Sequence, residues 1–301
     1  MSYRLVTHSS DPHAIYSEDA RIVVIGCGGT GGYLAEAICR LLMGKRASLY
    51  LVDMDRVEPA NLGRQAFDES DLGQFKAQVL ASRLARRFHR EIGYSVVPYD
   101  ASVHGEVFGS GLSARLSLIV GCVDNARARQ SIAKTLEGYT SGRWDRRGSW
   151  WLDAGNSRND GQVLLGNATN PEDLRGAFST DLGLCRAIPA PSLQRPDLLV
   201  APYLPEPEGA CAERVVRGDQ GPTINQMVAA IAASFVEKLL AGTCSWMAAY
   251  FDMEQGTLRT VQAEPKVVAQ LVGLHVNSTR RGGRVGNGGG SGERQQQRRS
   301  G

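Results

Sequence analysis

Short apolar runs and helical apolar spacing alternate along the first half of the chain. Largely apolar runs of four to six residues are typical of strands buried on both faces of a parallel sheet. They occur at 21–26, 48–52, 94–97 and 116–120. Between them, apolar side chains recur every three or four residues after Gly26 and over 72–88, which predicts helices. This alternation predicts an α/β fold with a Rossmann-like, doubly wound sheet.

The second half of the chain predicts a mixed, partly antiparallel region. Its expected elements are strands at 151–153, 162–165, 247–251 and 258–261 and a helix over 223–240. A proline-bearing stretch at about 171–222 shows no clear periodicity up to the helix, and stretches of that kind are usually functional or mobile. We therefore expect one continuous domain over 1–277 that joins a parallel half to a mixed half.

Composition and charge set apart the last residues of the chain. The 301 residues are 42% hydrophobic and 22% charged, as in globular domains, and no apolar run is long enough to span a membrane or to form a secretory signal. A cytoplasmic protein is the resulting expectation. Residues 278–301 are rich in Arg, Gly and Gln and almost free of apolar residues, which predicts a disordered tail. Such a tail is solubilising, and weak contact with nucleic acid is an alternative role.

The six cysteines are spread along the chain and form no Cys-x-x-Cys pair, so a zinc ribbon or thioredoxin motif is not expected. They are Cys27, Cys39, Cys122, Cys185, Cys211 and Cys244. Free thiols in a reducing compartment are the simplest interpretation. The five histidines likewise show no ligand spacing.

A glycine-rich segment follows the first long strand and opens a helix, which is the context of a phosphate-binding loop. Its glycines include Gly26, Gly28, Gly29 and Gly31. They let backbone N–H groups approach an anion at the positive end of a helix. Asp53 lies 22 positions after Gly31, at the end of the second strand, where a carboxylate can accept ribose hydroxyls. A nicotinamide dehydrogenase would show the same features.

Polar residues beyond Asp53 favour a nucleoside triphosphate over a dinucleotide. They are Asp55, Asn61, Arg64, Gln65 and Lys76, followed by Asp124 and Asn125 after a later strand. Arg64 can fork onto phosphate oxygens, Lys76 adds a point charge, and Asp124 can hold Mg²⁺ at the same sheet edge. As a set they predict an ATP site.

At these motifs the chain resembles the ThiF, MoeB and HesA family of adenylating enzymes, which are related to ubiquitin-activating enzymes. The resemblance covers about residues 20–242, and through 153–166 and 220–226 the chain looks most like the ThiF-type proteins of the PRTRC system. It implies adenylation of the C-terminal glycine carboxylate of a small ubiquitin-like or sulfur-carrier protein, with ATP and Mg²⁺. Asn61, Arg64 and Lys76 would be catalytic.

Many members of this family then capture the acyl group on a cysteine. Cys211 matches the position of that cysteine, with Cys185 as the other candidate. Two features depart from the family pattern. The zinc-binding Cys-x-x-Cys pairs are missing, so no zinc is expected, and only Arg4 stands before the first strand where dimeric relatives place an arginine. A homodimer is implied by the resemblance alone.

Three other functions are compatible with parts of the sequence. An NAD(P)-dependent oxidoreductase would explain the glycine loop and Asp53 but would leave Asn61, Arg64 and Lys76 without a role. An inactive, adenylation-like scaffold subunit is disfavoured by the intact set of motifs. A relative that modifies tRNA, by activating a carboxylate attached to the RNA, is mildly favoured by the basic tail.

Overall fold

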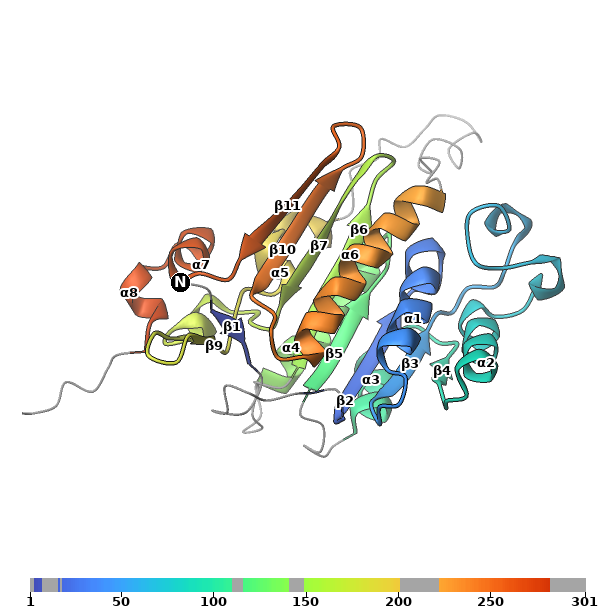
Figure 1. The fold of residues 1–301 in the computed structure, drawn as a ribbon, viewed down its shortest axis with the longest axis horizontal. Coiled ribbons are helices and arrows are strands. Elements are labelled where there is room, and N and C mark those ends of the chain that lie inside the picture. Colours follow the sequence, from blue (N-terminus) through green and yellow to red (C-terminus); the bar gives the residue numbers. More distant parts are fainter. Residues whose placement is uncertain are drawn as a thin grey trace, which may run out of the picture.

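The computed structural model describes residues 3–6, 16, 18–109, 116–140, 149–200 and 222–281. Most of its strands form one eight-stranded sheet in the order β11-β10-β7-β6-β5-β2-β3-β4 (Figure 1). The parallel strands are β2 (Ala20–Ile25), β3 (Ser48–Val52), β4 (Gly93–Ser95), β5 (Leu116–Gly121) and β6 (Ser149–Asn156). The antiparallel strands are β7 (Asp160–Gly166), β10 (Trp246–Asp252) and β11 (Thr257–Gln262). The predicted parallel half and mixed half are both confirmed.

Helices cover both faces of this sheet. The longer ones are α1 (Gly29–Leu41), α2 (Lys76–Phe88), α3 (Ala101–Phe108), α4 (Ala126–Thr140) and α6 (Pro222–Leu240). Side chains of α1, α2 and α6 pack on one face, and those of α3 and α4 pack on the other. Helices α3 and α4 stand between the expected strands, as a doubly wound fold requires, and α2 begins at Lys76, four residues later than the helical spacing suggested.

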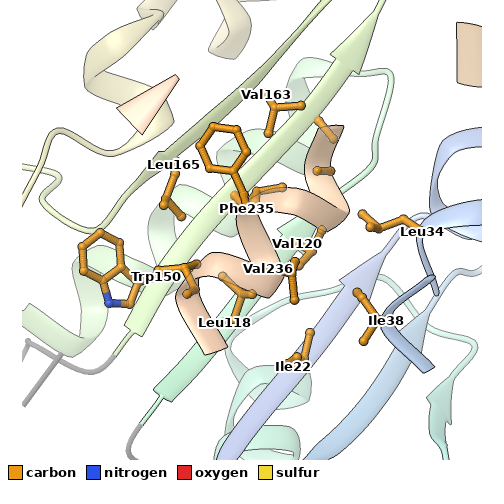
Figure 2. Packing of buried hydrophobic residues seen from close by; sticks show 14 of the residues in the cluster. Ile22, Leu34, Ile38, Leu118, Val120, Trp150, Val163, Leu165, Phe235 and Val236 are labelled. Carbon is orange, nitrogen blue, oxygen red and sulfur yellow. The ribbon is translucent and has the colours of Figure 1, made fainter. Parts of the chain in front are cut away.

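The main core lies between α1, α6 and the sheet, as Figure 2 shows. Phe235 and Val236 project from α6 towards β5, β6 and β7, and Leu34 and Ile38 of α1 reach β2 beside them. The strand residues in contact with them are Ile22, Leu118, Val120, Trp150, Val163 and Leu165. Burying each such side chain is worth roughly 1.5–3 kcal/mol, so this layer fixes α1 and α6 firmly on the sheet.

A second, three-stranded sheet brings the start and the end of the described chain together. It contains β1 (Arg4–Leu5), β9 (Leu184–Cys185) and β8 (Phe178–Ser179), in that order. Short helices η4 (Pro171–Leu174), α5 (Pro191–Gln194) and η5 (Pro196–Leu199) flank it in the chain, so the described part of the stretch expected to be irregular carries short elements.

The last elements are α7 (Pro265–Val272) and α8 (Val276–Thr279), and two short helices, η1 (Pro59–Asn61) and η2 (Glu69–Asp71), precede α2. Arg280 forms a bridge to Phe178, and the N–H of Arg281 donates to the Phe178 carbonyl at 2.8 Å. The first four residues of the tail expected from residue 278 therefore belong to the described structure. Backbone pairing with a distant strand holds them there, although their side chains are polar. No helix in the described ranges has the length and hydropathy of a membrane span.

His104 of α3 gives the fold a testable dependence on pH. The residue is 1% exposed, and the Tyr99 hydroxyl lies 2.5 Å from its Nδ1. Burial lowers the pKa of His104 from 6.5 to about 4. The unfolded chain therefore takes up a proton below pH 6.5 that the folded protein refuses until about pH 4, so folding loses stability as the pH falls through this window.

We expect this group alone to remove about 2 kcal/mol of unfolding free energy between about pH 7.5 and pH 5. Urea unfolding at both values measures the loss. His104→Gln should show a loss smaller by that amount, whatever its absolute stability. An identical pH dependence in wild type and variant would contradict the assignment.

Candidate nucleotide-binding site

The loop after β2 is held in a shape that only glycine permits at two positions. Gly26 has φ +89°, and a Cβ there would lie 2.4 Å from the Cys122 carbonyl oxygen at the end of β5. A Cβ on Gly31 would lie 1.8 Å from the Gly26 carbonyl oxygen. The first turn of α1 is therefore packed directly on the carboxyl ends of two central strands. The glycine pattern in the sequence has this steric cause.

The start of α1 is open to a ligand. Gly28 is its N-cap residue, and no side chain in the described part of the chain caps the helix, so the first-turn N–H groups and the positive helix end are available to an anion. Beside the loop, the amide nitrogen of Gln65 lies 3.6 Å from the Cβ position of Gly28. The Gln65 Oε1 is buried and has no hydrogen-bond partner among the described residues. Such an orphaned acceptor suits a ligand hydroxyl or amine at this place.

Asp53 links this loop to the end of β3. Its Oδ2 accepts the Cys27 N–H at 2.6 Å, and its Oδ1 accepts the Asp55 N–H at 2.8 Å. Burial raises the pKa of Asp53, against these two hydrogen bonds and the nearby Lys76 ammonium, which act to lower it. The carboxylate thus already has a structural role, and each oxygen keeps lone-pair capacity for the ribose hydroxyls that the sequence suggested.

Lys76 joins the same cluster from the first residue of α2. Its Nζ lies 3.2 Å from Asp55 Oδ2, and its backbone N–H donates to the Asp55 carbonyl at 2.9 Å. The lysine side chain is 9% exposed and the aspartate side chain 60% exposed. Because the Asp55 carboxylate that pairs with it faces water, the ammonium group retains much of its attraction for another anion.

Asn61 and Arg64 occupy the turn between β3 and α2. Asn61 is 5% exposed, and its Oδ1 accepts the Glu58 N–H at 3.0 Å within η1. The Nε of Arg64 donates to the Ala60 carbonyl at 3.3 Å. Within the described part of the chain, no carboxylate lies within ion-pair distance of Arg64. The structure shows no direct contact that joins either residue to the Lys76 cluster.

Asp124 and Asn125 follow β5 at the same sheet edge, and both are exposed. The Oδ1 of Asn125 accepts the Ala128 N–H at 2.9 Å, so this amide caps the start of α4. Its nitrogen lies 3.3 Å from Asp124 Oδ1. Among the described residues, no group of three or more His, Cys, Asp or Glu side chains could hold a metal ion. Asp124 could supply one carboxylate to Mg²⁺ that is bound mainly by a nucleotide.

Sequence reasoning gave no role to a buried ion pair under this edge. Arg129 of α4 donates through Nε to both carboxylate oxygens of Asp153 in β6, at 3.0 and 3.2 Å. Their side chains are 9% and 0% exposed. Burial raises the pKa of Asp153, and the Arg129 guanidinium opposes that shift. A second unassigned group, Thr30, Asn156 and Asn225, lies on the α6 side of the sheet.

The described cysteines are poor nucleophiles in this structure. Burial raises the pKa of every one of them, to about 11 for Cys39 and about 12 for Cys244, with Cys27, Cys122 and Cys185 also raised. Cys185, the second candidate from the sequence, is fully buried, and its Sγ lies 3.2 Å from the Ala187 carbonyl oxygen. Cys211 lies outside the described residues.

The Arg129–Asp153 pair yields a prediction about stability. Arg129→Met leaves a fully buried carboxylate unpaired, which costs about 3–5 kcal/mol of unfolding free energy. Adding Asp153→Leu should recover most of that loss, because no uncompensated charge remains. The matched control is Arg195→Ala, which breaks an exposed pair with Asp197 and should cost less than about 1 kcal/mol. Urea unfolding compares the variants, and equal losses for Arg129→Met and Arg195→Ala would contradict the prediction.

The sequence of this chain is similar to those of known proteins. Ubiquitin-like modifier-activating enzyme 5 of Rattus norvegicus is 28% identical over 246 residues, which is 77% of this chain and 53% of that protein. The tRNA threonylcarbamoyladenosine dehydratase of Escherichia coli K12 is 33% identical over 115 residues, 38% of this chain and 41% of that protein. The chain thus spans about half the length of the curated relatives it matches.

The fold is shared with solved structures of low sequence identity. The crystal structure of E. coli MccB with ATP superposes with a TM-score of 0.52 at 16% identity, covering 82% of this chain and 64% of that one. The model of the ThiF family matches residues 16–267, which is most of the chain. The chain belongs to the ThiF family.

Proposed function

We propose that this protein uses ATP to adenylate the C-terminal glycine carboxylate of a small ubiquitin-like or sulfur-carrier protein. The observation that carries the proposal is the α1 N-terminus, which no described side chain caps and which begins at closely packed glycines. The Gln65 oxygen, unpaired among the described residues, lies beside it, and Lys76 stands at the first residue of α2. A triphosphate matches this arrangement of open N–H groups and cations. Similarity to a ubiquitin-like modifier-activating enzyme and to MccB, crystallised with ATP, adds support.

The chemistry requires charge stabilisation more than proton transfer. A carboxylate oxygen of the partner attacks the α-phosphorus of ATP, a new phosphorus–oxygen bond forms, and the bond to the β-phosphate oxygen breaks to release pyrophosphate. The nucleophile is already ionised, so no general base is required. Arg64 and Lys76 would stabilise charge that spreads over the phosphates, and Asn61 would orient them. Mg²⁺ on Asp124 would add neutralising charge when bound.

The decisive experiment separates this function from the other classes. We expect calorimetric titration to show binding of ATP with Mg²⁺ and no comparable binding of NAD or NADP. Tight dinucleotide binding without an ATP signal would favour an oxidoreductase. If ATP binds but no exchange with pyrophosphate occurs with any small Gly-ended protein, an inactive scaffold is favoured; if tRNA stimulates exchange instead, the acceptor is RNA. The match to a tRNA-modifying enzyme justifies including tRNA.

A prediction about catalysis concerns Arg64. Arg64→Ala should lower partner-dependent ATP–pyrophosphate exchange by on the order of 10²–10³, because one preorganised contact to developing charge is lost. Lys76→Ala and Asp124→Ala should act in the same direction. Arg175→Ala is the control, since that exposed arginine pairs, among the described residues, with Glu172 on η4, and its exchange rate should match wild type. Wild-type exchange in Arg64→Ala would identify Arg64 as an ordinary surface charge.

A further prediction concerns Cys211. We propose that its thiolate attacks the adenylated carbonyl, with AMP as the leaving group and a thioester as the product. Arg214 follows three positions later in the sequence, and a guanidinium close to a thiol would favour the thiolate. Cys211→Ala should therefore keep pyrophosphate exchange but lose the reductant-sensitive conjugate with the partner protein.

Cys185→Ala is the matched control, because Cys185 is buried and its thiol pKa is raised. It should keep both exchange and conjugate. A conjugate that persists in Cys211→Ala would reject Cys211 as the nucleophile, and its loss only in Cys185→Ala would transfer the role to that residue. No conjugate in wild type would mean that the reaction ends at the adenylate.

A further inference from the structure

Three polar side chains from distant parts of the chain meet beside the glycine loop. Thr30 lies in the first turn of α1, Asn156 is the last residue of β6, and Asn225 is in the first turn of α6. The Thr30 hydroxyl oxygen lies 3.2 Å from Asn225 Oδ1 and 3.3 Å from Asn156 Oδ1. Thr30 is 8% exposed and Asn225 is 2% exposed. The contacts are therefore largely shielded from water.

Asn225 also explains a glycine that the strand-to-helix turn does not itself require. A Cβ on Gly29, the first residue of α1, would lie only 2.2 Å from Asn225 Nδ2. The amide of Asn225 is thus packed against the backbone of the loop, next to the N-cap Gly28. Any larger residue at position 29 would displace the Asn225 amide from this place.

The packing of α1 against α6 does not need these polar groups. Apolar residues of both helices, including Leu34, Ile38 and Val228, are fully buried between the helices and the sheet. Apolar side chains at all three polar positions would avoid the desolvation cost that a buried amide or hydroxyl carries. The Thr30 hydroxyl has one proton, so it donates to one of these two amide oxygens at a time. The contacts among Thr30, Asn156 and Asn225 instead fix the position of the loop relative to α6 and β6.

We propose that Asn225 is a positioning residue for nucleotide binding. Through Thr30 and its contact with Gly29, it holds the loop in the conformation whose N–H groups receive the phosphates of ATP. The proposal rests on the ATP site proposed above. It extends that site to the first turn of α6, an element that would not itself touch the nucleotide phosphates.

Two isosteric or smaller substitutions test the proposal. Thr30→Val removes the hydroxyl while keeping the shape, and Asn225→Ala removes the amide. Each should raise the Kd for ATP with Mg²⁺ about tenfold, because a loop that is less ordered before binding loses more conformational entropy when ATP binds. Hydrogen exchange of the amides in 26–33 should become faster in the nucleotide-free protein. Thr30→Ser, which keeps the hydroxyl, should restore wild-type values for both.

Thr135→Val is the matched control for a general loss of stability. Thr135 is 4% exposed on α4, and its hydroxyl donates to the Ile132 carbonyl at 2.7 Å, far from the loop in sequence. This variant should lower the melting temperature without changing the Kd for ATP or the exchange of 26–33. If Asn225→Ala does not fold, Asn225→Asp keeps the shape and an acceptor for Thr30. Its negative charge beside the α1 N-terminus should weaken ATP binding still further.

The outcomes distinguish this proposal from the proposed function. If wild type does not bind ATP, the ATP site fails, while faster exchange of 26–33 in Thr30→Val and Asn225→Ala would still support the positioning role. If wild type binds ATP and both variants bind it equally well, the positioning role is overturned. A Kd that rises in Thr135→Val as much as in Thr30→Val would also overturn it.

Discussion

The close approach of α1 to the ends of β2 and β5 is the constraint on which the rest of the site depends. Because Gly31 lies against the Gly26 carbonyl, the helix starts at the sheet edge, with no room for a side chain between them. Asp53 then binds the loop from β3, and α6 packs on it from the other side. A larger residue at position 31 would displace α1, and with it the layer of apolar side chains shared by α1 and α6.

The end of β6 connects both faces of the sheet to this edge. Alternate residues of a strand point to opposite faces, so Asp153 meets Arg129 on the α4 side while Asn156 meets Thr30 on the α1 side. Both contacts are polar, the first buried and the second partly buried, and each joins the end region of the strand to a helix. Because unpaired buried polar groups are costly, these contacts favour one arrangement of α1, α4 and β6 around the edge. The same strand therefore fixes the position of two helices near the proposed phosphates.

Local signals in the sequence were sufficient for the strands of the eight-stranded sheet and for the glycine loop, since apolar runs and glycine spacing are properties of short segments. They were not sufficient for contacts that the topology creates. Arg129 and Asp153 are 24 residues apart, and Thr30 and Asn225 are 195 apart, so nothing in their neighbourhoods indicates a pair. Short polar residues were hard to interpret for another reason: Asn61 and Asn125 suit a ligand, yet in the structure their oxygens cap local turns. The pairing of the chain ends through β1, β9 and Arg280 was equally invisible.

The ion pairs of four described cations differ in how closely the acid is held and how far it is buried. Arg83 lies 2.6 Å from the buried Asp71, and Arg129 holds the buried Asp153; both pairs have good geometry and little water around the acid. Lys76 instead faces an exposed acid at 3.2 Å, and Arg64 contacts only a backbone carbonyl among the described residues. Lys76 and Arg64 are therefore less closely neutralised than Arg83 and Arg129, and in the proposed site they would contribute positive potential. A polyanion such as a triphosphate would supply the missing charge there.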